Sequence, residues 1–373
     1  MKLLAAFLVA LAVSAFAQSA GTPVVIKREG CFAAGSLAFS PDGSELAQAC
    51  GFAPIEIFDT TNYRKARTFR SQIDYTPDLR GFAYSPDGKT MATVRPDIGA
   101  EIWNAADPGK PVPPKNGESY KSFYGVDELY ALDKPLRVLE APRSSRDEFA
   151  SAVDVDYSPD GKFLFTKHHN GHVKIWDTSS WTLQREFIVS DKGNSALFSV
   201  LAVAPDSKSF VVGDPDGVLH VWNLDSKSET RAVSSPDVRG KMFVELMFSA
   251  DGKILVAIHR GKKLADGTAV VWNTTDWTSH TLNGYTAAAF SRDGRLLALG
   301  GPDIKLFDSA SCKELRTIEL PTFTKGELLP NSADRPDAGE KLPCGVYALA
   351  FSPDGETLAF GCFDTLHIMK LDR

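Results

Sequence analysis

Ser40-Pro41-Asp42-Gly43 is a tight-turn sequence that occurs seven times, intact or with substitutions, along the 373 residues of the chain. The later copies are Ser85-Pro86-Asp87-Gly88, Ser158-Pro159-Asp160-Gly161, Ala204-Pro205-Asp206-Ser207, Ser249-Ala250-Asp251-Gly252, Ser291-Arg292-Asp293-Gly294 and Ser352-Pro353-Asp354-Gly355. Proline presets φ at the first corner, aspartate bonds the backbone beyond it, and glycine accepts the positive φ that closes a tight hairpin. Each copy joins two short apolar runs, as Leu37-Ala38-Phe39 and Leu46-Ala47 do, which predicts a pair of antiparallel strands.

A third apolar segment follows each turn, and most copies of it alternate apolar and polar residues before an aromatic residue and Asp or Asn. These segments are 55–59, 100–104, 173–177, 219–223, 269–273, 304–308 and 366–370. A repeat of about 45 residues with four strands per unit is typical of a propeller, in which each blade buries its flanks against its neighbours. We therefore expect an all-β, seven-bladed β-propeller of four-stranded antiparallel blades.

The third segments resemble the WD40 family. Its Trp-Asp signature is matched by Ile175-Trp176-Asp177, Ile102-Trp103-Asn104, Val221-Trp222-Asn223 and Val271-Trp272-Asn273, and in softened form by Phe58-Asp59 and Phe307-Asp308. The resemblance covers nearly the whole chain after its first residues and implies a non-catalytic scaffold that binds a protein or peptide on one face. The Gly-His pair of many WD40 repeats is absent, and Met369-Lys370 replaces the last signature, so the family's histidine network is not implied. Lactonase-like and surface-layer propellers, which share the turn but lack the signature, are the other reading.

The order of the segments predicts how the ring closes. The last copy ends almost at the C-terminus, so we expect residues 23–27 to supply the outermost strand of the last blade. Two copies are stretched by insertions, at about 105–134 and 322–342. Long loops on a rigid ring often carry binding function, although each insertion also reads as a packing loop.

The first residues read as a cleaved signal peptide over 1–17, with Lys2, a short apolar run and Ala15-Phe16-Ala17 before Gln18. This pattern predicts an exported protein, periplasmic or extracellular and of bacterial type, whose mature part is a single domain over 18–373. The apolar run is too short to span a membrane. Without Lys2 the formal charge of −6 becomes −7, which argues against nucleic acid as a partner. We expect a monomeric ring.

Cysteines in an exported chain suggest disulfides. Cys31 and Cys50 flank the first hairpin, and Cys344 and Cys362 occupy nearly the same places in the last one. We favour disulfides between Cys31 and Cys50 and between Cys344 and Cys362, although four cysteines allow three connectivities. The alternative is a zinc ion bound by the four thiolates. We expect the fifth, Cys312, to be free in an outer strand.

The remaining candidate residues are polar. The tract His168-His169-Asn170-Gly171-His172 suggests metal binding, but Asn-Gly favours a hairpin turn there. The face with the turns between second and third strands collects a basic set that could attract an acidic partner or be merely solvated. This set is Arg80, Arg95, Lys167, Arg239, Lys241, Arg260, Lys262 and Lys263, and together with His168 and His169 it makes up the candidate binding residues.

Motifs for catalysis are missing from the sequence, which has no Gly-x-Ser-x-Gly, no phosphate loop and no His-Glu-x-x-His. We therefore predict no enzymatic activity, no cofactor and no metal. A propeller hydrolase acting at the channel mouth, and a purely structural envelope component, remain the rival functions.

Overall fold

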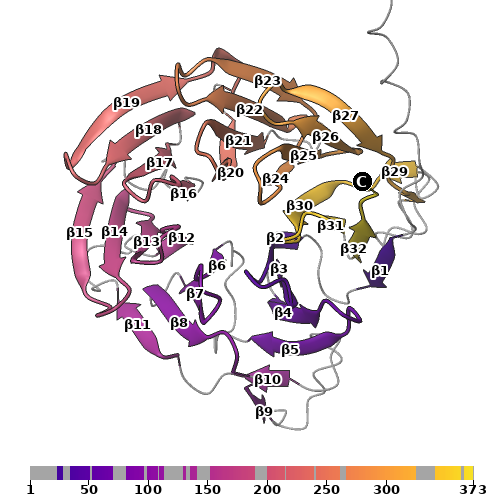
Figure 1. Ribbon diagram of the computed structural model, residues 1–373, viewed down its shortest axis with the longest axis horizontal. Coiled ribbons are helices and arrows are strands. Elements are labelled where there is room, and N and C mark those ends of the chain that lie inside the picture. The colour runs from indigo at the N-terminus through magenta and orange to yellow at the C-terminus, as the bar shows by residue number, and fades with distance from the viewer. Residues whose placement is uncertain are drawn as a thin grey trace, which may run out of the picture.

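The computed structural model describes residues 23–27, 34–50, 53–69, 81–95, 99–107, 109–112, 129–131, 135–140, 152–189, 200–214, 216–238, 241–260, 266–324, 341–362 and 365–372. Within them, seven four-stranded antiparallel sheets stand around a central axis as the blades of a ring (Figure 1). The predicted seven-bladed propeller is confirmed. The predicted signal peptide lies outside the described residues.

The first three blades follow one another along the chain, each from an innermost to an outermost strand. Blade 1 is β2 (Ala34–Phe39), β3 (Glu45–Cys50), β4 (Ala53–Asp59) and β5 (Lys65–Phe69). Blade 2 is β6 (Phe82–Tyr84), β7 (Thr90–Arg95), β8 (Gly99–Asn104) and β11 (Arg137–Glu140). Blade 3 is β12 (Ala152–Tyr157), β13 (Phe163–His168), β14 (His172–Asp177) and β15 (Leu183–Ile188).

The next three blades repeat this order. Blade 4 is β16 (Leu201–Val203), β17 (Ser209–Gly213), β18 (Val218–Asn223) and β19 (Ser228–Ser234). Blade 5 is β20 (Met242–Phe248), β21 (Ile254–Arg260), β22 (Thr268–Asn273) and β23 (Ser279–Asn283). Blade 6 is β24 (Ala287–Phe290), β25 (Leu296–Gly300), β26 (Ile304–Asp308) and β27 (Lys313–Ile318).

Blade 7 is assembled from both ends of the chain. Its inner strands are β30 (Val346–Phe351), β31 (Thr357–Cys362) and β32 (Thr365–Lys370), and its outermost strand is β1 (Val24–Lys27). Val25 pairs with His367, and Ile26 packs against the apolar cluster between blades 7 and 1. The predicted closure by residues 23–27 is therefore confirmed.

Apolar residues from adjacent blades fill the wedges between them. Ile57 of blade 1 lies in one buried cluster with Trp103 of blade 2, and Ile102 of blade 2 lies in the next cluster with Trp176 of blade 3. Burial of such area is the main favourable term in folding, and radial stacking provides it for every blade. The signature tryptophans thus serve the contacts between blades.

The recurring turns also interlock around one end of the channel. In blade 1, Ser40 Oγ donates to Asp42 Oδ1 at 2.6 Å, and Gly43 has a φ of +76°. Because a Cβ at Gly43 would stand 3.4 Å from Cδ of Pro353, the turn of blade 1 abuts the turn of blade 7. In blade 4, Ser207 replaces the glycine at a φ of +55°, and its hydroxyl accepts from Asp160 N of blade 3. We call this end the 1–2 face and the opposite end the 2–3 face, after the strands whose turns they carry.

The two insertions lie at opposite ends of the ring. The first joins the third and fourth strands of blade 2 and contains the hairpin β9 (Lys110–Val112) and β10 (Leu129–Ala131), of which β10 contacts β5 of blade 1. The second joins blades 6 and 7 through β28 (Thr322–Thr324) and β29 (Lys341–Pro343). The chain order puts the second insertion on the 2–3 face, as the sequence predicts.

One detail differs from the sequence prediction. Cys312 is free, but it lies in the turn between β26 and β27 with a φ of +55°, and the prediction of an outer strand was wrong.

Candidate functional site

The 2–3 face of blade 5 carries two of the predicted basic residues side by side. Lys241 comes directly before β20 and Arg260 ends β21, where its backbone pairs with Met242. Lys241 Nζ donates to Thr268 Oγ1 at 2.6 Å, and that hydroxyl in turn donates to Asn283 Oδ1. The chain of bonds fixes the ammonium group at the rim of the blade while leaving it partly exposed.

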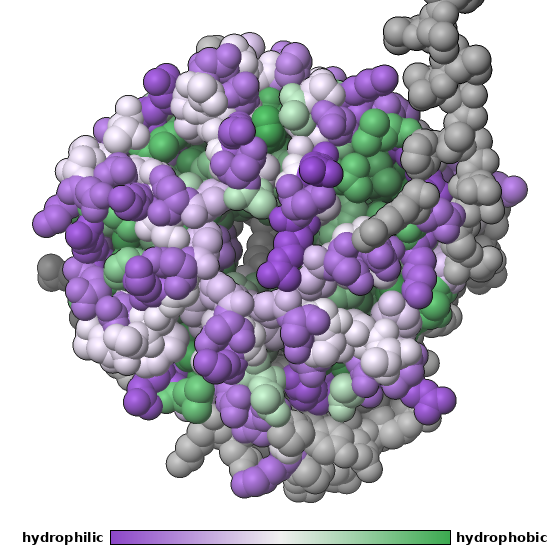
Figure 2. Space-filling model, viewed as in Figure 1, coloured by the Kyte–Doolittle hydropathy of each residue, from purple (hydrophilic) through white to green (hydrophobic). Residues whose placement is uncertain are grey.

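An aromatic residue from another blade shares this neighbourhood. Tyr347 lies on β30, the innermost strand of blade 7, and burial raises its pKa while the positive charge of Arg260 opposes that rise. Because blade 6 stands between blades 5 and 7 along the ring, the two side chains approach each other toward the channel. Figure 2 shows the channel as an opening in the middle of the ring with hydrophilic residues beside it. Blades 5 and 7 therefore contribute jointly to one polar region.

Lys167 and His168 do not belong to an exposed surface. Only 1% of Lys167 and 2% of His168 is exposed, and Lys167 Nζ donates to the carbonyl of His168. Burial lowers the pKa of Lys167 to about 8, against the opposing charge of Asp154, which pairs with it across β12 and β13. Their place among the candidate binding residues was wrong, because both side chains lie inside the blade stack and not in solvent.

The other predicted basic residues are not all placed. Arg80, Arg239, Lys262 and Lys263 lie outside the described residues, and of Arg95 the structure describes only the strand to which it belongs. His169 lies half-buried in the turn between β13 and β14. That turn has the predicted form, with Gly171 at a φ of +81° and its N–H donated to His168 O at 3.0 Å.

Three carboxylates on innermost strands bridge adjacent blades. Asp154 and Asp156 of β12 accept from Leu201 N and Val203 N of blade 4, and Glu245 of β20 accepts from Ala288 N of blade 6. The distances are 2.9, 3.2 and 3.1 Å in that order. Each carboxylate thereby satisfies an N–H that an edge strand would otherwise leave unpaired.

These carboxylates share one electrostatic environment. Burial raises the pKa of Asp156 and that of Glu245 to about 7, and the negative charge of Asp154 adds to both increases. Two of the three groups therefore change charge near neutral pH. Their hydrogen bonds run to backbone and join blades, which is a structural arrangement and not a pairing of acid with nucleophile.

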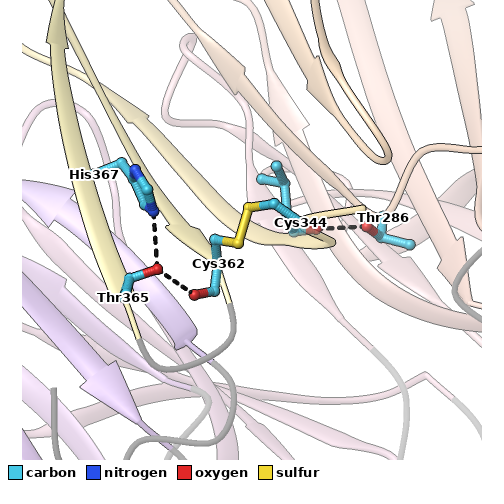
Figure 3. Close-up of a disulfide and its surroundings, with 6 residues drawn as sticks. Thr286, Cys344, Cys362, Thr365 and His367 are labelled. Atoms are coloured by element: carbon cyan, nitrogen blue, oxygen red, sulfur yellow. Dashed lines mark hydrogen bonds between the residues drawn. A yellow bond between two sulfur atoms is a disulfide. The ribbon is translucent and has the colours of Figure 1, made fainter. Parts of the chain in front are cut away.

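One predicted disulfide is present. Cys344 and Cys362 are bonded, with their Cα atoms 5.6 Å apart (Figure 3). Cys31 lies outside the described residues, and the side chain of Cys50 is not described, so their pairing stays a prediction. The bond joins the segment before β30 to the end of β31 and thus ties the second insertion to blade 7.

The Asp or Asn that ends most third strands has a role that the sequence analysis did not identify. Asp177 Oδ1 accepts from Ser179 N and Ser180 N, and Asn223 Oδ1 accepts from Asp225 N and Ser226 N in the same way. A large residue then takes a left-handed conformation four positions on, as Trp181 does at a φ of +57°. The regular spacing from the signature to this residue was the available signal. The signature Asp is thus a turn cap.

Comparisons with known proteins agree with this architecture. Residues 134–177 and 340–366 match the family profile of the WD domain, G-beta repeat. The first match begins before the outer strand of blade 2 and ends with the third strand of blade 3, so a repeat is offset from a blade by one strand. The chain is a seven-bladed β-propeller, and two of its segments match the WD40 repeat.

Curated proteins with similar sequences carry several names. The target of rapamycin complex subunit LST8 of Bos taurus is 23% identical over 125 residues, which cover 34% of this chain and 35% of that protein. Protein LST8 homolog of Drosophila melanogaster is 22% identical over 245 residues, 64% of each chain. Telomerase protein component 1 of Rattus norvegicus is 28% identical over 328 residues, 87% of this chain and 10% of that protein. The chain spans less than two thirds of the length of each of these relatives.

No helix in the described part of the chain is long and apolar enough to cross a membrane.

Proposed function

We propose that this protein is an exported, non-catalytic scaffold that binds an acidic protein or peptide on its 2–3 face. The observation that carries the proposal is the approach of Arg260 to Tyr347 beside the channel, with Lys241 next to the strand partner of Arg260, on the face that also holds the second insertion. A positively charged patch attracts carboxylate-rich peptides, and arginine and tyrosine are enriched in protein interfaces.

The relatives support binding and not catalysis. Proteins with WD40 repeats generally act as non-catalytic platforms for other proteins, and the Bos taurus relative is named as a subunit of a complex. The charge of the chain, −6, argues against nucleic acid, and a rigid ring offers its loops without large rearrangement. We propose that the ring is monomeric and that its partner is a protein.

Export rests on the first residues. Lys2, the apolar run after it and Ala15-Phe16-Ala17 fit a leader cleaved before Gln18, and a disulfide between Cys344 and Cys362 suits an oxidising compartment. N-terminal sequencing of the protein recovered from bacterial periplasm or medium tests this part. A new terminus near Gln18 supports export, and an intact Met1 with the protein retained in the cytoplasm overturns it.

Capture of partners tests the binding face. The wild-type protein and K241A/R260A are used as baits, with crosslinking, in an extract of the envelope and medium of the source cells. The matched control is K89A/K162A, which removes two cations from exposed turns of the 1–2 face. The proposal expects a protein that wild type and K89A/K162A recover equally and that K241A/R260A loses. Equal recovery by all three baits, or no partner for any of them, contradicts it.

A further inference from the structure

The disulfide of blade 7 lies against a buried histidine that the proposed function does not use. One nitrogen of His367 and the Sγ atoms of Cys344 and Cys362 lie within 4.8 Å of one another, and all three residues are buried. Among the described residues this is the group of His, Cys, Asp and Glu whose donor atoms are close enough to share a metal ion. Figure 3 shows it where β31 and β32 meet, with Thr286 of blade 6 on the far side of the disulfide.

The hydrogen bonds of His367 leave one of its nitrogens with a lone pair. Thr365 Oγ1 donates its proton to Cys362 O at 2.7 Å and lies 2.8 Å from His367 Nε2. Because the hydroxyl has a single proton, Nε2 must be the protonated nitrogen that donates to it. A proton on Nδ1 as well would leave a buried charge with no acceptor beside it among the described residues, so the ring is neutral. Nδ1 therefore carries a lone pair, and it is buried with no hydrogen-bond partner in the described part of the chain.

The ring of His367 is held in place by packing as well. It stacks on Phe360 with the ring centres 4.8 Å apart and an angle of 8° between the planes. Only 2% of the residue is exposed. A buried imidazole nitrogen with an unused lone pair is costly. Neutral imidazole is the commonest metal ligand among side chains, so a metal ion could take this lone pair.

We infer that Cys344, Cys362 and His367 form a metal site that a dithiol reductant opens, and that it binds a thiophilic divalent ion such as Zn²⁺. The dithiol transfers two electrons and two protons to the protein disulfide and itself becomes a disulfide. Both new protein thiols release their protons when their sulfurs bind the ion. Two thiolates, one imidazole and a water then complete a tetrahedral set.

The spacing of the donors suits this ion. In a tetrahedral zinc site the donor atoms stand about 3.5–3.8 Å apart, since Zn–S is about 2.3 Å and Zn–N about 2.0 Å. Sulfurs released from their bond move apart, and the nitrogen has to approach by about 1 Å from the 4.8 Å limit. Binding through Nδ1 uses the unpartnered lone pair, whereas binding through Nε2 replaces the bond to Thr365.

The position of the site gives it a consequence for the 2–3 face. Cys344 directly follows β29, and its N–H donates to Pro321 O, so the residue closes the base of the second insertion. Thr286 of blade 6 donates to Val346 O, two residues further on. Both the disulfide and a bound metal thus fix the insertion to the joint of blades 6 and 7, and the reduced, metal-free protein leaves it without that link. This inference does not depend on the identity of a partner.

Cobalt titration of the full chain, with absorption spectra in the presence of a dithiol, tests the site. Co²⁺ replaces Zn²⁺ and reports thiolate ligands by charge-transfer bands and tetrahedral geometry by visible bands. We expect one equivalent of Co²⁺ to bind to the reduced wild type and to C31S/C50S, none to bind to C344S/C362S, and none to bind to the oxidised protein. H367F keeps a ring to stack on Phe360, and its affinity should fall at least tenfold, since even loss of an outer partner of a metal ligand costs about that much.

Three outcomes overturn the inference. They are the absence of thiolate bands in the reduced wild type, unchanged affinity in H367F, and loss of the bands in C31S/C50S, which would assign the metal to four thiolates. A fall in affinity for H367F while folding, checked by circular dichroism, is unchanged distinguishes a ligand from a packing residue.

Discussion

Blades 3 and 7 contain the same pair of residues in different surroundings. In blade 3, Thr166 Oγ1 lies 3.0 Å from His168 Nε2 and accepts from Trp176 Nε1 at 3.0 Å. In blade 7, Thr365 Oγ1 lies 2.8 Å from His367 Nε2, but both residues belong to the third strand, which has Met369 at the position of the signature tryptophan. Blade 3 is one continuous segment, whereas blade 7 joins both ends of the chain.

The difference shows two ways to hold a blade together. Blade 3 relies on a buried hydrogen-bond network, which favours one arrangement because each broken bond leaves an unsatisfied group. Blade 7 lacks the tryptophan and instead has a covalent bond and the pairing of β1 with β32. We therefore expect blade 7 to be sensitive to truncation and reduction, and blade 3 to loss of a hydroxyl and to pH.

Removal of β1 should have the largest effect. A chain that begins at residue 28 loses the ladder to β32 and the packing of Ile26, and we expect its free energy of unfolding to fall by about 3–5 kcal/mol. Urea denaturation measures the change, and a chain that begins at residue 23 is the control. Equal stability of the two chains would show that the strand does not close the ring.

Loss of the disulfide comes next. The bond joins residues 18 apart, and removal of a cross-link of this size costs about 3 kcal/mol. We expect C344A/C362A to lose about that much in denaturation with a metal chelator present. C312S, which alters a free cysteine, should unfold like the wild type, and a similar loss in C312S would argue against a specific role for the disulfide.

A single hydroxyl tests blade 3. T166V leaves both Trp176 Nε1 and His168 Nε2 without their partner, and we expect a loss of about 2 kcal/mol. T93V in blade 2 is the matched control, because Thr93 accepts from Trp103 Nε1 as Thr166 does from Trp176 Nε1, and it should lose about 1 kcal/mol. If T93V proves as costly as T166V, the histidine adds nothing to the network.

The smallest effect concerns pH. The pKa of Asp156 is raised to about 7, above its unfolded value near 4, so the folded state holds an extra proton between these values and stability falls as pH rises through them. D156N still accepts from Val203 N but cannot ionise. From pH 5 to pH 8 we expect D156N to gain about 1 kcal/mol relative to wild type, which is less than the full linkage because the residue is only partly shielded from solvent.

The control for this prediction is D160N in the same blade. Hydrogen bonds from Ser158 and Lys162 outweigh burial and lower the pKa of Asp160, so its contribution is complete above pH 4 and D160N should show no added slope between pH 5 and pH 8. Parallel pH profiles for wild type and D156N would contradict the raised pKa.

The periodic features of the fold could be predicted from the sequence because each is local. A Ser-Pro-Asp-Gly turn fixes its own hairpin, and the position of the last copy left residues 23–27 as the strand that closes the ring. The pairing of Cys344 with Cys362 followed from the same order of strands.

Features that depend on how strands face one another were not predictable in this way. Lys167 was assigned to an exposed face, but its neighbour across the sheet, Asp154, lies on the flank that meets blade 4. No sequence motif indicates a role for His367, since its proximity to Cys344 arises only when β30, β31 and β32 pair. Side-chain direction and burial decide both cases, and a linear pattern does not contain them.

The contacts between neighbouring turns of the 1–2 face are not the same at every joint of the ring. Gly88 lies against Pro41 and Gly161 lies against Pro86, so these turns are in contact from one blade to the next. A Cβ at Gly355 would meet nothing within 4 Å, because blade 6 has Arg292 where other blades have a proline. Arg292 extends instead to Pro41 O of blade 1. The joint of blades 6 and 7 therefore lacks the proline contact that joins other turns, and the disulfide between Cys344 and Cys362 lies beside the same joint, at the opposite end of the channel.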